Sequence, residues 1–457
     1  MTFDLAILGG GPAGYVAAGR AGSVGLSVLL FEKRELGGVC LNEGCIPTKT
    51  LLYSAKVYDY ARHADKYGVQ VPDAVVDIDA VFKRKEKVVK KLVGGVRVQM
   101  RNANVEVVKE TAVIQGRGAD GFTLQAGEET FQARNILVCT GSEAVVPPIP
   151  GLREGLGGVV VTNREILSLA EKPERLVVIG GGVIGMEFAS FFNSIGTQVT
   201  VVEMLPKILG PMDDEISTML QAQYAKKGVE FHLGCKVTAV EGNEVVYETA
   251  EGEVCRVAGD RILVSVGRRA VLGGIGLENI GVELALNPAG RPYGIKTDAQ
   301  MRTNVSGVYA AGDVTGFSML AHTASREGEV AVNTILGHKD EMQYNAIPGV
   351  VYTNPEVAGV GLTESEAAAK GVEVQVHKLP MAFSGRFVAE NERGEGLCKV
   401  LTSNGVVVGV HMLGNPCSEI IAAACVAIEK GLTLEALKEV VFPHPTVSEI
   451  FKETLFA

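Results

Sequence analysis

Two stretches of the chain share one order of apolar and polar positions. Residues 3–33, "FDLAILGGGPAGYVAAGRAGSVGLSVLLFEK", contain a short apolar run, a glycine turn, a run of small residues and a second apolar run. Residues 174–204, "ERLVVIGGGVIGMEFASFFNSIGTQVTVVEM", repeat that order. Short apolar runs beside glycine turns are typical of buried strands, and longer small-residue stretches are typical of helices. Each stretch therefore predicts a strand, a turn, a helix and a second strand.

Both turns have the spacing G-x-G-x-x-G, and a glutamate ends each second strand. The residues are Gly9, Gly11, Gly14 and Glu32 in the first copy, and Gly180, Gly182, Gly185 and Glu203 in the second. Glycines let the backbone approach a pyrophosphate at the helix N-terminus, and the carboxylate accepts hydrogen bonds from a ribose. One such turn alone is equally typical of a tight strand-to-helix connection. The complete unit, occurring twice, predicts two dinucleotide sites.

Two dinucleotides in one chain indicate a hydride transfer between them. No arginine follows Glu203 closely, so the second site is expected to prefer NAD to NADP, which needs a cation for its 2′-phosphate. Lys207 is the nearest cation and leaves that preference open.

Composition narrows the classes of protein. The chain has 457 residues, 47% of them hydrophobic and 21% charged, which is enough for about three folded domains. The net charge of −10 disfavours nucleic acid as the main partner. The basic run 83–91, "KRKEKVVKK", is interpreted as the solvated face of a helix whose inner face holds Val88 and Val89. The most apolar segments are interrupted, as at Arg20 and Glu187, so no membrane span is expected.

Only two of the eight cysteines, Cys40 and Cys45, lie close together. The N-terminus lacks the basic start and cleavage site of a secretory signal, and the cysteine spacing does not indicate a disulfide framework. We therefore expect a reducing compartment, the cytoplasm.

The cysteine pair lies in residues 37–49, "GGVCLNEGCIPTK", and such a pair has three possible uses. A metal site needs further ligands at suitable spacing, and none follow. A structural staple gains little from so short a loop. A redox pair is favoured, but about 7.5 Å separates residues five apart along a helix, so a disulfide requires a break in the helix. Gly44 supplies freedom for that break, and Pro47 suits the start of a helix over 48–64.

The segment "GGVCLNEGCIPTK" resembles the active-site stretch of the flavoprotein disulfide reductases. The resemblance covers nearly the whole chain and implies two cofactors, FAD and NAD. In this family Cys45 would lie nearest the flavin as a thiolate, and Cys40 would exchange with the substrate. Lys49 would lie near the flavin and pair with Glu187, whose alternative is a solvent-facing helix position.

Four further segments carry the resemblance to the cofactor sites. They are "TNVSGVYAAGD" (303–313), "LVCTGS" (137–142), "LVSVGRR" (263–269) and "MLAH" (319–322). The implied cofactor-binding residues in them are Asp313, Thr140, Gly141, Gly267, Met319 and Ala321.

A base is expected near the end of the chain, in "FPHPTVSEIF" (442–451). His444 lies between two prolines that restrict its backbone, and histidine accepts protons near neutral pH. Glu449 either orients the ring or forms a capping box with Thr446. The resemblance implies a catalytic His–Glu pair that reaches the disulfide of the other subunit, hence a homodimer.

Within the family, "MLAHTASREG" and "HPTVSE" look most like the dihydrolipoamide dehydrogenases. These oxidise dihydrolipoyl groups on subunits of 2-oxo acid dehydrogenase or glycine-cleavage complexes, and we expect such partners. Alternatives left open are another disulfide reductase, such as a glutathione reductase-like enzyme, a transhydrogenase, or a docking subunit.

The expected fold class is α/β, with two Rossmann-like FAD- and NAD(P)-binding domains and a C-terminal α+β dimerisation domain. The expected ranges are 1–145 for FAD, 146–272 for NAD, 273–345 for a central domain completing the FAD site, and 346–457 for the interface. No metal is expected.

Overall fold

The computed structural model describes residues 2–392 and 394–457, which divide into two compact units. Unit 1 consists of residues 2–50, 79–145 and 267–343, and unit 2 of residues 51–78, 146–266 and 344–457. Each unit is therefore built from separate stretches of the chain. The division into four domains stays a prediction.

Unit 1 is built on a seven-stranded sheet. Six strands follow the order β3-β2-β1-β6-β5-β4, and β19 pairs with β6. Their bounds are β1 Thr2–Leu8, β2 Val28–Phe31, β3 Glu106–Val108, β4 Ala112–Gly118, β5 Gly121–Ala126, β6 Glu129–Val138 and β19 Val308–Ala310. The strands β3, β2, β1, β6 and β19 are parallel, and the buried runs of β1 and β2 fit a sheet covered on both faces.

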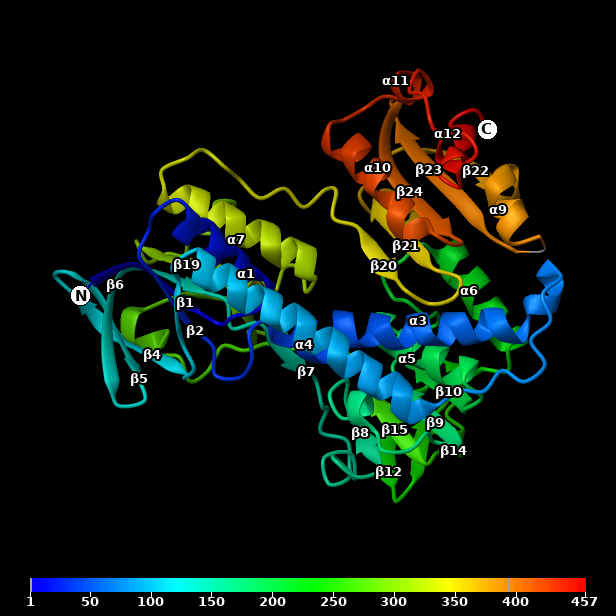
Figure 1. Ribbon diagram of the computed structural model, residues 1–457, viewed down its shortest axis with the longest axis horizontal. Helices are drawn as coiled ribbons and strands as arrows, with labels where there is room; N and C mark the ends of the chain where they lie inside the picture. The colour runs from blue at the N-terminus through cyan, green and yellow to red at the C-terminus, as the bar shows by residue number, and fades with distance from the viewer. Residues whose placement is uncertain (1, 393) are drawn as a thin grey trace. The chain divides into compact units, whose positions relative to one another are not determined.

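Helices cover this sheet. Helix α1 (Pro12–Ser23) follows the first glycine turn and packs beside α7 (Ala321–Ile335), as Figure 1 shows. The short α2 (Gly38–Glu43) precedes α3 (Cys45–Arg62), and α4 spans Ile78–Asn102. Small sheets pair β7 (Ser142–Ala144) with β16 (Arg268–Ala270) and β17 (Leu284–Leu286) with β18 (Pro292–Ile295), and the 3-10 turns are η3 (Glu278–Ile280) and η4 (Asp313–Thr315).

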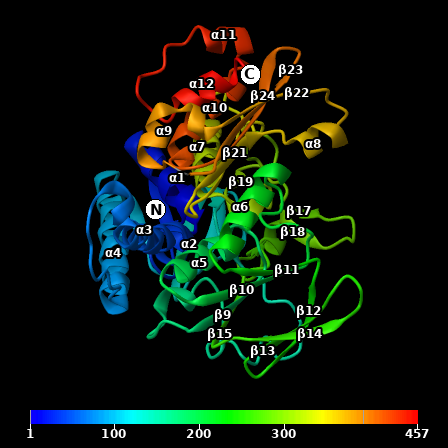
Figure 2. The ribbon, with the colours of Figure 1, turned by 90° about the vertical axis from the view of Figure 1, so that its right-hand side faces the viewer.

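Unit 2 contains the second parallel sheet, in the order β11-β10-β9-β15-β8. Its strands are β8 Val160–Val161, β9 Arg175–Ile179, β10 Gln198–Glu203, β11 Glu230–Leu233 and β15 Arg261–Val264, with helices α5 Val183–Ser194 and α6 Asp214–Lys226. A three-stranded sheet, β12 Lys236–Glu241, β13 Glu244–Glu248 and β14 Val254–Ala258, lies next to it (Figure 2). The two sheets share one apolar core. The turns η1 (Ala64–Tyr67) and η2 (Ile166–Ser168) complete this part.

The C-terminal part of unit 2 is an antiparallel sheet in the order β20-β21-β24-β23-β22. Its strands are β20 Gly349–Val351, β21 Val357–Gly361, β22 Gln375–Pro380, β23 Leu397–Ser403 and β24 Val406–Leu413. The accompanying helices are α8 Glu364–Ala369, α9 Gly385–Glu390, α10 Cys417–Glu429, α11 Leu434–Lys438 and α12 Glu449–Thr454, with η5 at Met381–Phe383. Helix α10 packs its apolar face on β21 and β24.

Three local expectations can be compared with this fold. The basic run lies on α4, where Val88 and Val89 are half-buried as expected, but Lys85 is also buried, so the run is not wholly solvated. The helix after the cysteine pair begins at Cys45, earlier than predicted, and places Pro47 in its first turn. No helix among the described residues is both long and apolar enough to cross a membrane.

Candidate functional site

The first glycine of each predicted dinucleotide turn occupies a position that only glycine fits. Gly9 and Gly180 have φ angles of +110° and +105°. A Cβ atom on Gly9 would lie 2.2 Å from the Cys139 carbonyl oxygen, and one on Gly180 would lie 2.6 Å from the Ser265 carbonyl oxygen. The two turns therefore have the same backbone for the same steric reason.

The third glycine of each motif brings its helix close to the preceding strand. A Cβ atom on Gly14 would lie 1.8 Å from the Gly9 carbonyl oxygen, and one on Gly185 would lie 2.0 Å from the Gly180 carbonyl oxygen. A side chain at either position would push α1 or α5 off its sheet.

The middle glycines, Gly11 and Gly182, lie beside open space. The nearest atom to a Cβ on Gly11 is the Gly38 Cα at 3.9 Å, and none lies within 4 Å of a Cβ on Gly182. Both residues are helix N-caps without a side-chain hydrogen bond to the first turn. Backbone N–H groups beside open space at a helix N-terminus fit a pyrophosphate, so both turns fit a dinucleotide.

The glutamate of each unit also accepts hydrogen bonds from the backbone of its glycine turn. Glu32 Oε2 accepts a hydrogen bond of 2.9 Å from the Gly10 amide, and Glu203 Oε2 accepts one of 2.6 Å from the Gly181 amide. In both cases the other carboxylate oxygen accepts from the amide two residues further on, at 2.8 Å. The strand end and the glycine turn are thereby fixed together, which holds the carboxylate at the mouth of the site.

Lys207, the cation nearest Glu203 in sequence, has other partners. Its Nζ donates to the Met212 carbonyl oxygen at 2.7 Å and forms an ion pair with Asp214. One partner on its own loop and one at the start of α6 hold the ammonium group, and this supports the preference of the second site for NAD.

The cysteine pair lies where the chain passes from α2 to α3. Helix α2 ends at Glu43, Gly44 has φ −144° and ψ −108°, and α3 begins at Cys45. The helix is therefore interrupted between the two cysteines, as a bond between them requires. In this structure both are thiols.

The surroundings of the pair favour the protonated form of Cys40. A hydrogen bond with Cys45, together with burial, raises the pKa of the Cys40 thiol, and the nearby Lys49 ammonium opposes that rise. The Cys40 thiol therefore holds its proton more strongly than an ordinary cysteine thiol. Burial, followed by Cys40 and Cys45, raises the pKa of Tyr15, which places this α1 side chain near the pair.

A close backbone contact joins the cysteine segment to the first glycine turn. Gly38 has φ +57°, and a Cβ on it would lie 2.7 Å from the Gly11 Cα. The Gly37 amide donates to the Gly10 carbonyl oxygen at 2.8 Å. The predicted FAD turn and the predicted redox pair are thus neighbours within unit 1.

Asp313 forms a polar cluster that the sequence alone did not indicate. The Ser142 hydroxyl donates to Asp313, and Arg268 donates through Nε to the Ser142 Oγ at 2.7 Å. Burial raises the pKa of Asp313, and the Ser142 hydrogen bond opposes that rise. Ser142 and Arg268 lie one residue beyond Gly141 and Gly267, and that adjacency is the signal that identifies them.

The other residues implied by the resemblance to this family lie in the same unit. Thr140 donates through Oγ1 to the Val271 carbonyl oxygen at 2.7 Å. Gly267, with φ +114°, follows β15. Met319 and Ala321 are half-buried at the start of α7.

Glu187 lies on α5 and is 3% exposed, so the solvent-facing alternative is wrong. Its Oε1 accepts a hydrogen bond of 3.1 Å from the Tyr352 amide. Its pairing with Lys49, which belongs to unit 1, stays a prediction.

His444 and Glu449 meet through a hydrogen bond of 2.8 Å between Nδ1 and Oε1. The Thr446 amide donates to the other carboxylate oxygen, Oε2, at 2.8 Å. The backbone bond and the imidazole lower the pKa of Glu449. The alternative capping box is incomplete, because α12 begins at Glu449 with Ser448 as its N-cap and no side-chain cap. The His444 side chain is 79% exposed, so its ring faces outward from this chain.

Two family models match the chain. Pyridine nucleotide-disulphide oxidoreductase matches residues 3–328, and the dimerisation domain of the same class matches residues 347–455. The chain belongs to this family of flavoprotein oxidoreductases. Its cofactors are FAD and NAD, and the predicted fold class, enzyme class and cofactors are confirmed at this level.

Individual members of the family are similar to this chain over nearly its whole length. The chain is 40% identical to a dihydrolipoyl dehydrogenase of Chlorobaculum parvum, over 100% of this chain and 97% of that protein. A dihydrolipoyl dehydrogenase of Chlamydia muridarum is 36% identical over 99% of this chain and 96% of its own length. Among solved structures, LpdA of Mycobacterium tuberculosis has a TM-score of 0.89 at 26% identity, covering 100% of this chain and 99% of that one.

Proposed function

We propose that the chain is a dihydrolipoyl dehydrogenase, which oxidises dihydrolipoyl groups and passes their electrons to NAD. The observation that carries this proposal is the setting of the cysteine pair. The helix is interrupted at Gly44 between the two cysteines, and their segment packs against the first glycine turn through Gly38. Full-length relatives that bear this name, at 35–40% identity, support the choice of substrate.

The first step is a thiol–disulfide exchange. His444 takes the proton of one substrate thiol, and Glu449 orients the imidazole through Nδ1 and stabilises its cation. The substrate thiolate attacks Cys40, the Cys40–Cys45 bond breaks, and Cys45 leaves as a thiolate.

The second substrate thiol loses its proton and attacks the substrate sulfur joined to Cys40. The mixed disulfide breaks, lipoyl disulfide is released, and Cys40 takes up a proton. Two electrons now reside on the protein dithiol, with the proton on Cys40 and the charge on Cys45, the distribution that the raised pKa of Cys40 favours. Bound FAD and NAD supply the route by which this electron pair leaves as a hydride.

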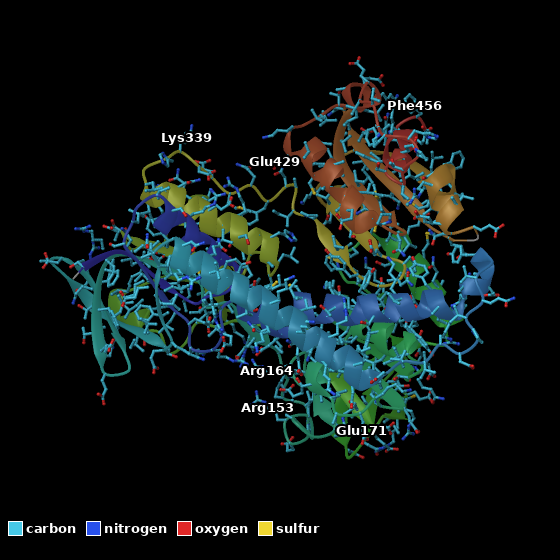
Figure 3. The ribbon with its side chains drawn as sticks, in the orientation of Figure 1. Arg153, Arg164, Glu171, Lys339, Glu429 and Phe456 are labelled. Carbon is cyan, nitrogen blue, oxygen red and sulfur yellow. The ribbon has the colours of Figure 1, made fainter. Side chains whose placement is uncertain are left out.

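A homodimer is the proposed active unit. The dimerisation domain at residues 347–455 supports it, and so does the outward-facing His444, which is available to a second copy. Near the end of the chain, Phe456 is 60% exposed (Figure 3). Lipoyl-bearing subunits of 2-oxo acid dehydrogenase or glycine-cleavage complexes are the proposed partners. A cytoplasmic location is part of the proposal, because the cysteine spacing does not indicate a disulfide framework.

The test is NADH formation by the purified yellow protein, given dihydrolipoamide and NAD, beside a Cys45→Ser variant. We expect wild-type turnover and a loss of at least about a thousandfold in the variant, because no disulfide remains to accept the electrons. Faster NADPH-driven reduction of glutathione disulfide, with no NADH formed from dihydrolipoamide, would instead favour a glutathione reductase-like enzyme.

A further inference from the structure

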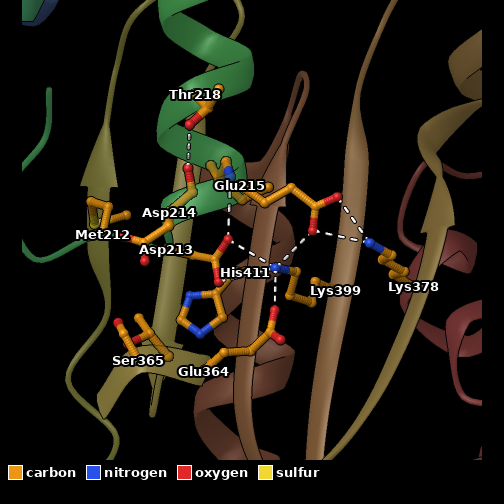
Figure 4. A network of polar contacts seen from close by, with 12 residues as sticks. Met212, Asp213, Asp214, Glu215, Thr218, Glu364, Ser365, Lys378, Lys399 and His411 are labelled. Atoms are coloured by element: carbon orange, nitrogen blue, oxygen red, sulfur yellow. Dashed lines mark hydrogen bonds and ion pairs between the residues drawn. The ribbon is translucent and has the colours of Figure 1, made fainter. Parts of the chain in front are cut away.

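A buried lysine on the C-terminal sheet contacts the segment that follows the second dinucleotide turn. Lys399, on β23, is 1% exposed, and its Nζ lies 3.0 Å and 3.2 Å from the two carboxylate oxygens of Asp213. Glu215 and Glu364 approach the same ammonium group at 2.8 Å and 2.6 Å (Figure 4). Asp213 is 2% exposed, so the pair at the centre is buried.

The opposite charges of Lys399 and Asp213 stabilise this buried contact. Burial lowers the pKa of Lys399, but bonds with Glu215, Glu364 and Asp213 outweigh burial and raise it, so the lysine stays charged. Removing one member of a buried ion pair leaves the other charge without compensation, which is strongly destabilising for that arrangement. Asp213 is therefore held where Lys399 places it.

Asp213 in turn fixes the start of α6. Its Oδ1 accepts a hydrogen bond of 3.2 Å from the Ile216 amide as the N-cap of that helix. The Lys399 ammonium and the first turn of α6 thus share one carboxylate. The C-terminal sheet is thereby linked to the end of the loop 204–213.

That loop leads back to the second glycine turn. It begins after Glu203, and its Leu209 amide donates to the Gly181 carbonyl oxygen at 2.9 Å. Leu209 has φ +60°, an uncommon conformation for a leucine, and its side chain is 1% exposed. A backbone held in such a conformation depends on the contacts around it, so the loop is sensitive to what anchors its far end at Asp213.

We propose that Lys399 is a positioning residue for NAD, acting through Asp213 and the loop 204–213 on Gly181 and Glu203. The inference rests on the proposed NAD site at the second glycine turn. It assigns the C-terminal sheet a role in nucleotide affinity in addition to its match to a dimerisation domain. Lys399 does not itself touch the nucleotide in this account.

The test compares Lys399→Met with Lys378→Met in the FAD-loaded protein. Lys378 faces Lys399 directly across the β22–β23 pair, and its Nζ contacts Glu215 at 3.0 Å without reaching Asp213. We expect Lys399→Met to raise the NADH dissociation constant and the KM for NAD about tenfold, and Lys378→Met to change neither by more than about twofold. Dihydrolipoamide should reduce the flavin of both variants at the wild-type rate when NAD is absent.

A lower melting temperature with an unchanged NADH dissociation constant in Lys399→Met would overturn the proposal, because the pair would then only stabilise the fold. If Lys399→Met does not fold, Asp213→Asn serves, since asparagine keeps the cap and removes the charge. NADH titration does not depend on the substrate. If dihydrolipoamide proves inactive while the two lysine variants still differ in NADH affinity, the proposed function fails and this inference stands.

Discussion

The two glycine turns of this chain are alike in backbone and different in what surrounds them. In both, the first glycine contacts a carbonyl oxygen that leaves no room for a Cβ, and a glutamate accepts the amide of the next glycine. The first turn meets Gly38 and the cysteine segment. The second meets the loop 204–213, anchored by Lys399.

This difference separates the part of each unit that specifies nucleotide binding from the part that specifies the chemistry beside it. The spacing G-x-G-x-x-G and its carboxylate specify a turn that admits a pyrophosphate. The segment after the carboxylate specifies the chemistry. In the first copy this segment contains the cysteine pair. In the second copy it is a loop in which Lys207 donates to the Met212 carbonyl oxygen.

The largest expected effect separates the two turns by cofactor. Gly9→Ala and Gly180→Ala introduce the same clash at equivalent positions, each with a positive φ. We expect Gly9→Ala to yield protein without flavin absorbance, and Gly180→Ala to retain the flavin but lose NADH binding by at least about a hundredfold. Absorbance spectra and NADH titration measure both. A yellow Gly9→Ala protein with unchanged flavin content would contradict the assignment of the first turn to FAD.

A third carboxylate, Glu449, differs from Glu32 and Glu203, because only one of its oxygens accepts from a backbone amide and the other contacts His444. Glu449→Gln is expected to lower kcat with dihydrolipoamide about tenfold or more, since the His444 cation loses its partner. A melting temperature close to wild type would show that the loss is not unfolding. Unchanged kcat would assign Glu449 to a structural role alone.

The pH dependence of this contact has a definite sign. The Thr446 amide and His444 lower the pKa of Glu449 below its ordinary 4.5, so the folded protein favours the ionised form. Its contribution is fully present above that ordinary value and is lost as pH falls through the lowered one. Carboxyl carbon NMR of Glu449 should therefore show its own titration midpoint below 4.5. A midpoint at or above 4.5 would contradict the observed contacts.

The smallest expected effect concerns the second turn alone. Asp214→Asn removes the ion pair that holds Lys207 and leaves its hydrogen bond to the Met212 carbonyl oxygen in place. We expect kcat/KM with NADP to rise about threefold relative to NAD, because a released cation attracts a 2′-phosphate. Steady-state assays with both nucleotides measure the ratio. A ratio equal to wild type would show that Glu203 alone excludes NADP.

The sequence predicted the parts of the molecule that local pattern determines. Both strand–turn–helix units and the break at Gly44 follow from spacing and residue type. Spacing left Glu449 between two roles, and the family resemblance favoured its approach to His444. Lys399 could not be recognised, because its partners lie on α6 and α8 and the sequence has no local sign of their meeting. Ser142 and Arg268 lie beside Gly141 and Gly267, which the sequence did indicate, but their contact depends on the β7–β16 pair, which has no local sign in the sequence.

The most direct measurement is the alkylation state of Cys40 and Cys45, read by mass spectrometry before and after dihydrolipoamide is added without NAD. We expect the oxidised enzyme to resist labelling at both cysteines, and dihydrolipoamide to expose them. Adding NAD should then restore the resistant form as NADH appears. NADH formation while both cysteines remain equally reactive throughout would contradict the account, because electrons would then reach NAD without passing through this pair.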